Sequence, residues 1–462
     1  MIRKTINEII DMIPVLNDVS PFGETRITGV SIDTRKIKKG NLFIPFKGEK
    51  VDGHKFVESA IENGAVAALW QKDAPNPPEG IPLLIVDDCL EALQELARSY
   101  RSQIGVKVVG VTGSNGKTTT KDMAASLLST KYKVQKTEGN YNNHLGLPLT
   151  VLNLDEDTEM AVLEMGMSSR GEISFLTRLA RPEAVIITNI GESHLLDLGS
   201  REGIAEAKLE ILEGLQEGGI AVLNGDEPLL MERVSGIGAG IHLQTFGRGE
   251  SNDMYPVEIT QSTHGNEFRV NLSDERFYLP VLGTHNIMNA MAAMLVARHF
   301  SLSFEEMAEG LKSVRLTQMR MELSEGLNGE KIINDAYNAS PTSMSAAIEL
   351  VANLGGYTKK ILVLGDMLEL GPLEKEYHHK IGEMLDPGKI NLVFTYGKLG
   401  SLIAEGARKV LGRERVYAFE EKEKLSKELK KHTNSDTLVL VKASRGMKLE
   451  EVVAFLQKEE SH

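Results

Sequence analysis

A β-branched run that enters a glycine-rich turn constrains the fold of this chain more than any other feature. Residues 106–111 read VKVVGV, and TGSNGKTTTKDMAASLLST follows directly. The run predicts a short buried strand, and the segment after the glycines predicts a helix. Repeated strand–turn–helix units build a parallel sheet with helices on both faces. We therefore expect a doubly wound α/β domain around this segment.

The turn also carries the groups that bind phosphate, although its glycine spacing is unusual. The common pattern is Gly, four residues, then Gly-Lys-Ser/Thr, but Val111 stands five residues before Gly116, and Gly110 is one residue too far. Phosphate binding requires free backbone N–H groups at a helix start, a Lys and a hydroxyl, rather than a fixed loop length. Lys117 can reach the β- and γ-phosphate oxygens, and Thr118, or Thr119 in its place, can bind Mg²⁺. The alternative is a glycine-rich turn without a ligand. The predicted nucleotide-binding residues of the loop are Gly113, Ser114, Asn115, Gly116, Lys117, Thr118 and Thr119.

The order of strand and helix patterns predicts three α/β domains. Residues 1–104 mix short apolar runs with turns and end in a helical stretch, which indicates a small N-terminal domain. Residues 105–317 contain MAVLEM, AVIITNI and GIAVLN as further strands of the central phosphate-loop domain, then a β-meander and the helix HNIMNAMAAMLVARHF. Residues 318–462 contain KKILVLGDM, INLVFTYG, RVYAF and DTLVLVKAS, which predict a C-terminal Rossmann-like α/β domain. Two such domains in tandem favour a ligand in the crevice at the carboxyl ends of their strands.

The first residues predict an amphipathic helix. Ile2, Ile6, Ile9 and Ile13 recur at helical spacing, with polar residues between them. This pattern is not the unbroken apolar run of a signal peptide. No apolar stretch approaches the ~18 residues that a membrane span requires. We therefore expect a cytoplasmic protein.

Charge and cysteine content exclude several classes of function. The formal net charge of −13 gives no general electrostatic attraction to nucleic acid or to an anionic membrane. The single cysteine, Cys89, excludes an internal disulfide and a thiolate zinc cage. At the start of a predicted helix, Cys89 is typical of a half-buried structural thiol.

Several polar residues follow predicted strands, where a sheet usually binds its ligand. Glu164 ends MAVLEM, so it suits Mg²⁺, although a surface glutamate is the alternative. The asparagines of TEGNYNNHLGLP suit a polar substrate or a plain turn. A single histidine after a strand, such as His194, is more typical of a structural residue than of a metal ligand. The position of Lys208 is typical of a solvated lysine on a helix.

A set of segments spread over essentially the whole chain resembles the Mur ligase family, in which the shifted glycine spacing of TGSNGKTTT is the rule. The segments are SIDTRKIKKGNLFIPFKG with DGHKF, TEGNYNNHLGLPLT, LEMGMSSRGEI, ITNIGESHL, AKLEIL, GTHNIMNAMAA, INDAYNASPTSM, GDMLELG and KASRGMKLE. The resemblance implies a monomeric, ATP- and Mg²⁺-dependent amide ligase that works through an acyl phosphate. YNASP, GDMLELG and KASRG resemble the members that join D-alanyl-D-alanine to UDP-N-acetylmuramoyl-tripeptide in peptidoglycan precursor synthesis. These two compounds are the partners that the resemblance implies.

The resemblance also implies roles for single residues. Glu164 and His194 would bind Mg²⁺ with Thr118, and Lys208 would be carbamylated by CO₂ and hold or orient the metal. Lys117, Lys208 and His194 would be the catalytic residues. Asn286 and Asn289 would flank the adenine, Arg320 would contact the phosphates and Asp335 the ribose. The sequence alone is also consistent with two alternatives: Arg320 as a cation on the surface, and Asp335 as an acidic residue at a helix N-terminus.

The implied substrate-binding residues lie in all three domains. The SIDTR segment matches a uridine-nucleotide motif, although a structural turn would look alike, and Arg445 is a natural partner for the carboxylate of the incoming dipeptide. The full set is Ser31, Asp33, Thr34, Arg35, Asn140, Asn142, Asn143, Ser168, Arg170, Tyr337, Asn338, Ser444 and Arg445.

Four alternatives remain at this point. The related ligase that adds the third peptide residue carries, in its diaminopimelate-adding form, an Asp-Asn-Pro-Arg motif that this chain lacks. Folylpolyglutamate synthetase shares the phosphate loop but lacks a uridine-type first domain. A switch or motor NTPase would hydrolyse ATP without a second substrate. A pure nucleotide-binding module would not hydrolyse it at all.

Overall fold

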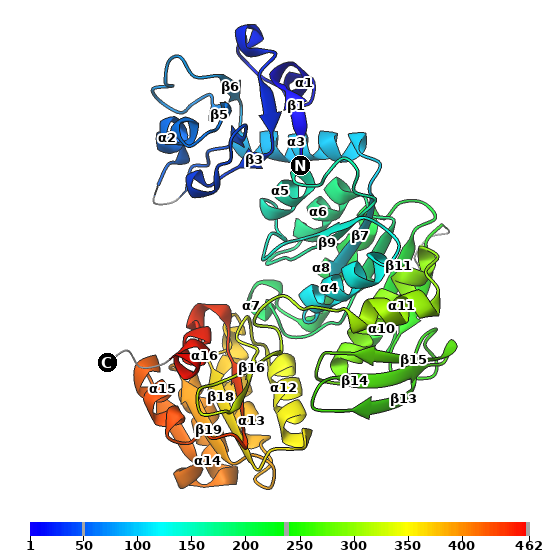
Figure 1. Cartoon of the computed structure of the whole chain (residues 1–462), viewed down its shortest axis with the longest axis vertical. Helices are drawn as coiled ribbons and strands as arrows, with labels where there is room; N and C mark the ends of the chain where they lie inside the picture. The colour runs from blue at the N-terminus through cyan, green and yellow to red at the C-terminus, as the bar shows by residue number, and fades with distance from the viewer. Residues whose placement is uncertain (49–50, 235–239, 459–462) are drawn as a thin grey trace.

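Three α/β units follow one another in the computed structural model, which describes residues 1–48, 51–234 and 240–458. Figure 1 shows the first and third units at opposite ends of the central one. The predicted fold class is confirmed. The exact boundaries, after residues 104 and 317, stay predictions.

The first unit contains a small parallel sheet in the order β3-β4-β5-β6 and an antiparallel pair, β1 and β2. Its strands are β1 (Arg3–Thr5), β2 (Arg26–Thr28), β3 (Val30–Ser31), β4 (Leu42–Phe43), β5 (Ala67–Gln71) and β6 (Leu83–Val86). Its helices are α1 (Ile6–Ile10), α2 (Val57–Glu62) and α3 (Cys89–Gln103). The long helix α3 leads into the central unit, as Figure 1 shows.

The predicted N-terminal helix is only partly correct. Residues Arg3–Thr5 form strand β1, and the helix begins at Ile6, because Thr5 and Glu8 form a reciprocal capping box there. The backbone groups of residues 3–5 form their hydrogen bonds with β2 in the antiparallel pair rather than within a helix. Ile2, Ile6, Ile9 and Ile13 are all buried, so the apolar spacing predicted burial correctly and secondary structure incompletely.

The central unit is built on a parallel sheet in the order β12-β11-β10-β7-β9-β8. Its strands are β7 (Lys107–Thr112), β8 (Val134–Lys136), β9 (Met160–Glu164), β10 (Ala184–Ile187), β11 (Ile220–Asn224) and β12 (His242–Phe246). The predicted meander forms the antiparallel strands β13 (Pro256–Gln261), β14 (Asn266–Val270) and β15 (Ser273–Leu279). The helices are α4 (Lys117–Leu128), α5 (Gly146–Leu152), α6 (Glu172–Ala180), α7 (Leu195–Leu198), α8 (Arg201–Leu209), α9 (Pro228–Val234), α10 (His285–His299) and α11 (Phe304–Lys312).

Side chains of the central strands alternate between two separate apolar layers. Val109 and Val111 of β7 pack in the layer that contains α4 and α10, whereas Val108 packs in the layer that contains α3 and α5. Burial on both faces explains why these strands read as unbroken apolar runs. Strand β7 lies inside the sheet, so the loop that follows it is held by neighbours on both sides.

The third unit has a mixed sheet in the order β16-β17-β21-β18-β19-β20, in which only β16 pairs antiparallel among the described strands. The strands are β16 (Glu322–Glu325), β17 (Lys331–Asn334), β18 (Lys359–Gly365), β19 (Leu392–Tyr396), β20 (Val416–Phe419) and β21 (Thr437–Lys442). The helices are α12 (Pro341–Asn353), α13 (Glu374–Glu383), α14 (Gly400–Leu411), α15 (Lys422–Lys430) and α16 (Glu450–Gln457). The ends of β17 and β21 carry the residues that face the phosphate loop.

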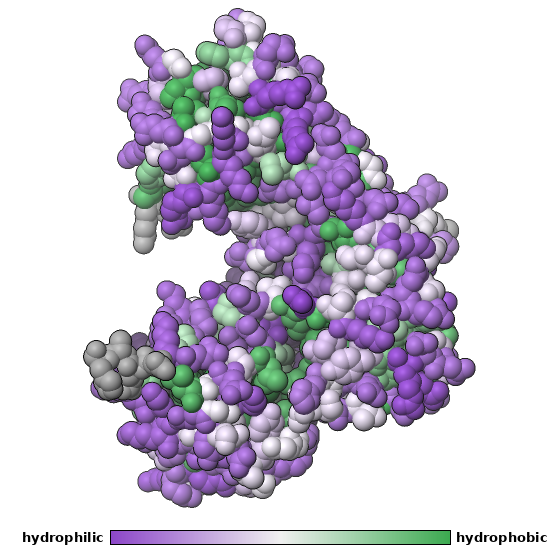
Figure 2. Space-filling model, viewed as in Figure 1, coloured by the Kyte–Doolittle hydropathy of each residue, from purple (hydrophilic) through white to green (hydrophobic). Residues whose placement is uncertain are grey.

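An open notch separates the first unit from the third on one side of the molecule, and Figure 2 shows it between the two lobes. Within the described ranges, no helix combines the length and the apolar character needed to cross a membrane. Cys89 is buried at the start of α3, and burial raises the pKa of its thiol to about 12. The thiol is therefore protonated and unreactive, as expected for a structural cysteine.

Candidate nucleotide and metal site

The turn after β7 has the backbone geometry of a phosphate loop. Gly113 and Gly116 have φ angles of 145° and 81°, a range that residues with a side chain rarely adopt. A Cβ atom on Gly113 would lie 1.8 Å from Thr188 Oγ1, and one on Gly116 would lie 2.7 Å from Asn289 Oδ1. Both glycines are required by the close approach of neighbouring side chains. Helix α4 begins directly after Gly116.

Residues at the end of the neighbouring strand β10 hold the loop in place. The Asn115 N–H donates to Asn189 Oδ1 at 3.0 Å, and the Ser114 N–H donates to the Asn189 carbonyl at 3.0 Å. The Thr188 hydroxyl donates to the Asn115 carbonyl at 2.5 Å. Sequence reasoning missed Thr188 and Asn189. The available signal was their position in AVIITNI, at the carboxyl end of a predicted parallel strand.

Lys117 lies folded back over the loop. Its Nζ donates to the carbonyls of Gly113 at 2.8 Å and Ser114 at 3.3 Å. Desolvation lowers the pKa of Lys117, and the nearby charge of Glu164 partly opposes this effect. An anionic phosphate at the loop would give this ammonium a stronger partner than two carbonyls.

Arg320 reaches the loop from the segment that joins the central and third units. Its Nη2 donates to Thr118 Oγ1 at 3.2 Å, and its guanidinium lies 4.1 Å from the ring centroid of Tyr337. The Arg320 Nε is buried and has no partner among the described residues. A buried, unpaired guanidinium N–H beside a phosphate loop fits an anionic ligand.

A cavity of about 280 Å³ lies between the loop, the start of α10 and the third unit. It brings together most of the residues predicted for ATP. The residues that line the cavity and were predicted from the sequence to bind ATP or substrate are Ser114, Asn115, Gly116, Lys117, Thr119, Asn286, Asn289, Arg320, Asp335 and Asn338. The crevice predicted at the carboxyl ends of two sheets is therefore present.

Other residues of this cavity were not predicted. His285 lines it beside Asn286, and burial lowers the pKa of this histidine to about 4, so the ring is neutral. Lys442 at the end of β21 also lines it, and its ammonium is ion-paired with Asp335. No local sequence pattern predicts this pair, because the two residues are far apart in the chain.

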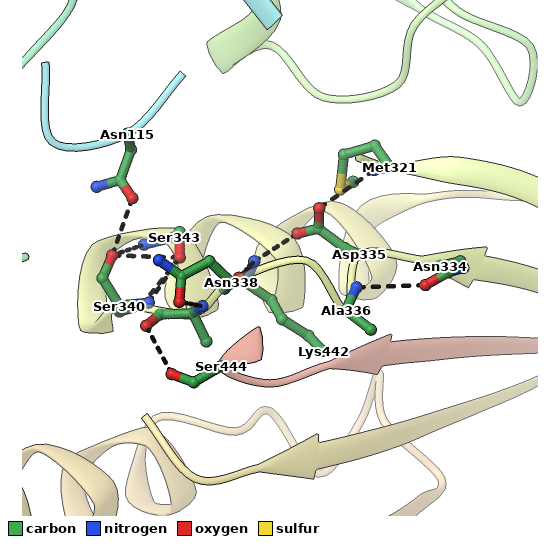
Figure 3. Close-up of polar contacts among 11 residues, drawn as sticks. Asn115, Met321, Asn334, Asp335, Ala336, Asn338, Ser340, Ser343, Lys442 and Ser444 are labelled. Atoms are coloured by element: carbon green, nitrogen blue, oxygen red, sulfur yellow. Dashed lines mark hydrogen bonds and ion pairs between the residues drawn. The ribbon is translucent and has the colours of Figure 1, made fainter. Parts of the chain in front are cut away.

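Figure 3 shows how the third unit meets the phosphate loop. The Ser340 hydroxyl donates to Asn115 Oδ1 at 3.0 Å, and Ser340 is also the N-cap of α12. Asp335 accepts from the Met321 N–H at 3.2 Å while it pairs with Lys442. Asn115, in the loop of the central unit, therefore contacts residues of both the central and the third unit.

Glu164 lies at the carboxyl end of β9, as predicted, and presents a free ligand atom. The residue is 3% exposed, and its Oε1 accepts from Asn142 Nδ2 at 2.8 Å. Its Oε2 is buried and has no partner in the described ranges. A buried carboxylate oxygen without a partner is costly unless a cation binds it, so Glu164 fits Mg²⁺.

His194 begins the short helix α7 with a left-handed φ of 65°. Its Nδ1 lies 3.1 Å from Glu369 Oε2 of the third unit, but no hydrogen bond forms at this atom. Desolvation, followed by the charges of Lys117 and Lys208, lowers the pKa of His194 to about 4. The imidazole is therefore neutral, which is the state that binds a metal.

Lys208 lies in α8 and is 1% exposed, so the alternative of a solvated helix lysine is wrong. No hydrogen bond or ion pair reaches its ammonium from the described residues. Desolvation, with the repulsion of Lys117, holds the pKa of Lys208 well below its usual value. Burial therefore disfavours the charged form of this amine.

The described residues contain no group of three His, Cys, Asp or Glu side chains close enough to hold a metal ion by themselves. A metal ion bound among the described residues would therefore need ligands besides carboxylate, imidazole and thiolate side chains. This arrangement suits Mg²⁺, which usually keeps several waters and takes the remaining ligands from substrate phosphates.

The residues predicted to bind the uridine nucleotide lie in a turn of the first unit, outside the 280 Å³ cavity. The Ser31 hydroxyl donates to the Asp33 carbonyl at 3.0 Å, and Thr34 begins a short 3₁₀ turn. Arg35 pairs with Asp33 through two side-chain bonds, although its own side chain is 86% exposed. This hydrogen bonding lowers the pKa of Asp33 to about 2. The free face of the Arg35 guanidinium points to solvent.

The other predicted substrate residues are divided between structural contacts and exposed surface. Asn143 accepts from the Leu145 and Gly146 N–H groups and so supports the start of α5. Arg170 is paired with Glu206 at 2.6 Å, and Arg445 with Glu450 at 2.8 Å. Ser444 accepts from the Leu368 N–H at 2.9 Å, and Asn140 and Ser168 are exposed. Tyr337 is the ring under Arg320.

Comparison with known proteins agrees with this three-part construction. The "Mur ligase family, catalytic domain" matches residues 26–101, the "Mur ligase middle domain" matches 111–297 and the "Mur ligase, glutamate ligase domain" matches 319–445. The UDP-N-acetylmuramoyl-tripeptide–D-alanyl-D-alanine ligase of Bacillus subtilis is 53% identical over 453 residues, which are 98% of each chain. This chain belongs to the Mur ligase family.

Solved structures of Mur ligase family members have the same architecture. MurF from Acinetobacter baumannii superimposes with a TM-score of 0.88 at 29% identity and covers 99% of both chains. MurF ligase from Thermotoga maritima in complex with ADP superimposes with a TM-score of 0.80 at 29% identity, over 96% of this chain and 98% of that one. The whole chain, rather than a single domain, is thus similar to Mur ligases.

Proposed function

We propose that this chain is an ATP-dependent ligase that joins D-alanyl-D-alanine to UDP-N-acetylmuramoyl-tripeptide in peptidoglycan precursor synthesis. The observation that carries the proposal is the cavity in which the phosphate loop, the start of α10 and the third unit meet. The relative from Bacillus subtilis, which matches along almost its whole length, bears the name of this activity. ATP binding agrees with the similar Thermotoga maritima structure, which is a complex with ADP.

The proposed reaction has two steps, and the residues of this chain position the groups for each. The tripeptide carboxylate attacks the γ-phosphoryl group of ATP, which forms an acyl phosphate and releases ADP. The amine of D-alanyl-D-alanine then attacks the acyl carbon, and the tetrahedral intermediate loses phosphate to give the amide. Lys117, Arg320 and the loop N–H groups offset the repulsion between the two anions in the first step. Approach of the third unit would exclude water from the acyl phosphate.

We propose Glu164, His194 and Thr118 as the protein ligands of Mg²⁺. The unpaired Glu164 oxygen and the neutral His194 ring are the observations that support this assignment. When bound, Mg²⁺ would neutralise charge on the phosphate oxygens. Lys208, a buried amine whose pKa is held well below its usual value, is the proposed site of carbamylation, which would place an anion near this metal.

The remaining assignments follow from the same proposal. Asn286, Asn289 and Asp335 would hold the nucleoside within the cavity they line. Arg35 in the first unit and Arg445 in the third would reach the two ends of the substrates, because each guanidinium remains exposed beside its carboxylate partner. The cleft is complete within one chain, which supports a monomer. We place the reaction in the cytoplasm, where ATP is available.

The proposal is tested by measuring ADP release and amide formation with a panel of uridine-linked tripeptides and amine donors. We expect sustained, multiple-turnover ADP release to require both the tripeptide and D-alanyl-D-alanine, because the acyl phosphate turns over only when the amine reacts with it. A switch or motor NTPase would release ADP without either, and a pure binding module would release none. The panel also decides whether the third peptide residue is lysine or meso-diaminopimelate.

A substitution at Glu164 tests the metal assignment. We expect Glu164→Gln to raise the Mg²⁺ concentration needed for half-maximal activity by about 10- to 100-fold, the usual effect of disturbing a metal site. The measurement is a Mg²⁺ titration of ADP release. The matched control is Glu159→Gln, because Glu159 is exposed just before the other end of β9. Equal Mg²⁺ requirements in both variants would contradict the assignment.

A further inference from the structure

The segment between α11 and β16 joins the central and third units, and the structure holds it at two points. These points are Thr317 and Met321, and each is held by a buried carboxylate from a different unit. Gln318, Met319 and Arg320 lie between them. The backbone of Met319 and Met321 is left-handed, with φ angles of 60° and 50°. Non-glycine residues adopt this conformation rarely, so the surrounding contacts must hold it in place.

Asp122 holds the first point from helix α4. Its Oδ2 accepts from the Thr317 N–H at 2.7 Å and from the Thr317 hydroxyl at 2.9 Å. Its Oδ1 accepts from Lys136 Nζ at 2.6 Å, and Lys121 Nζ lies 3.4 Å away. The Asp122 side chain is fully buried, so its charge is compensated by these four groups. Helix α4 is the helix that begins with Lys117 and Thr118 at the phosphate loop.

Asp335 holds the second point from the third unit. It accepts from the Met321 N–H while Lys442 compensates its charge. Residues 318–320 are therefore the part of this segment that lies between an anchor on the central unit and an anchor on the third unit. Arg320 is one of these residues, and its Nη2 contacts Thr118 Oγ1. The orientation of Arg320 at the phosphate loop thus depends on where the segment is fixed upstream.

We propose that Asp122 is a positioning residue that places the Arg320 guanidinium at the nucleotide phosphates by fixing the linking segment at Thr317. This inference rests on the proposed function only for the identity of the nucleotide. Asp122 does not line the 280 Å³ cavity, so it acts through Thr317 and the three residues that follow. Because the anchor lies on the helix that begins at the phosphate loop, it ties the position of Arg320 to that loop.

The test removes the Thr317 hydroxyl rather than Asp122, because loss of Asp122 would leave two lysines without their carboxylate. Thr317→Val keeps the side-chain shape and the N–H bond. We expect the ADP dissociation constant, measured by calorimetry without other substrates, to rise about 10-fold, the effect of one hydrogen bond to a charged acceptor. We expect kcat/KM for ATP to fall by a similar factor, and Thr317→Ser to restore both values.

A double-mutant comparison separates positioning from simple destabilisation. In an Arg320→Ala background, Thr317→Val should cause no further loss of ADP affinity, because the group that it positions is absent. Ser313→Ala is the matched control: it removes a hydroxyl of the same segment that contacts Ser126 of the same helix. The control should bind ADP like the wild type.

Three results would overturn the inference. One is unchanged ADP affinity in Thr317→Val, and another is the same further loss in the Arg320→Ala background as in the wild type. The third is an equal loss in Ser313→Ala. ADP affinity does not depend on amide formation, so failure of the wild type to form the amide would refute the proposed function without deciding this inference.

Discussion

Lys117→Ala should abolish ADP release in the presence of ATP, the tripeptide and D-alanyl-D-alanine. The only contacts of the Lys117 ammonium that the structure records are two loop carbonyls, at 2.8 and 3.3 Å, so no ion pair competes with an incoming phosphate. Removing it takes away a positive charge at the loop that would bind the attacked phosphoryl group. We expect a loss of at least about 100-fold in kcat, as for other groups that stabilise developing charge in a closed site.

The control for this prediction is Lys131→Ala. Lys131 lies just beyond the other end of α4, and its Nζ donates to the Ser301 carbonyl at the surface. That variant should release ADP at the wild-type rate. Full activity of Lys117→Ala in the same assay would contradict the assignment of the loop and, with it, the proposed ligase.

The fold could be predicted from the sequence largely because the strands of both large sheets are buried on two faces. Val109, Val111 and their counterparts form unbroken apolar runs, which stand out against the amphipathic helices between them. The edge strand β12 (His242–Phe246) was not predicted, because its pattern is half exposed and carries little apolar signal. The secondary structure of the N-terminus was predicted incompletely for a different reason. The spacing of the isoleucines predicted the burial of Ile2, but no local pattern predicts that β1 pairs with β2.

The site could be predicted as a set of residue types at strand ends, but not as a set of contacts. Glu164 was placed correctly because a strand end fixes a position within the sheet. The partners of Asp335 and Arg445, by contrast, are Lys442 and Glu450, and no local pattern links a predicted ligand to the side chain that satisfies it. For the same reason the sequence analysis missed Asn189, whose side chain contacts the phosphate loop from the end of the neighbouring strand β10.

The burial of Lys208 is the feature of the site that residue spacing in the sequence predicts least well. Its neighbours in AEAKLEIL indicate an exposed helix face, yet the side chain is buried and has no partner among the described residues. The free energy cost of burying an ammonium is avoided if the amine is neutral. A neutral amine can react with CO₂ to give a carbamate and a proton, which converts an uncompensated group into an anion near the proposed Mg²⁺ ligands.

Intact-mass measurement under neutral, bicarbonate-containing conditions should therefore show a fraction of the chain heavier by one CO₂, and Lys208→Gln should not show it. We expect Lys208→Gln to lose activity by roughly 100-fold, as for loss of a group that orients a metal. The wild type should lose activity in CO₂-depleted buffer and recover it when bicarbonate is added. The control is Lys312→Gln, at an exposed lysine that ends α11. If Lys208→Gln stays active and bicarbonate has no effect on the wild type, Lys208 is a buried amine without a catalytic role, and the carbamate is refuted while the assignment of Lys117 stands.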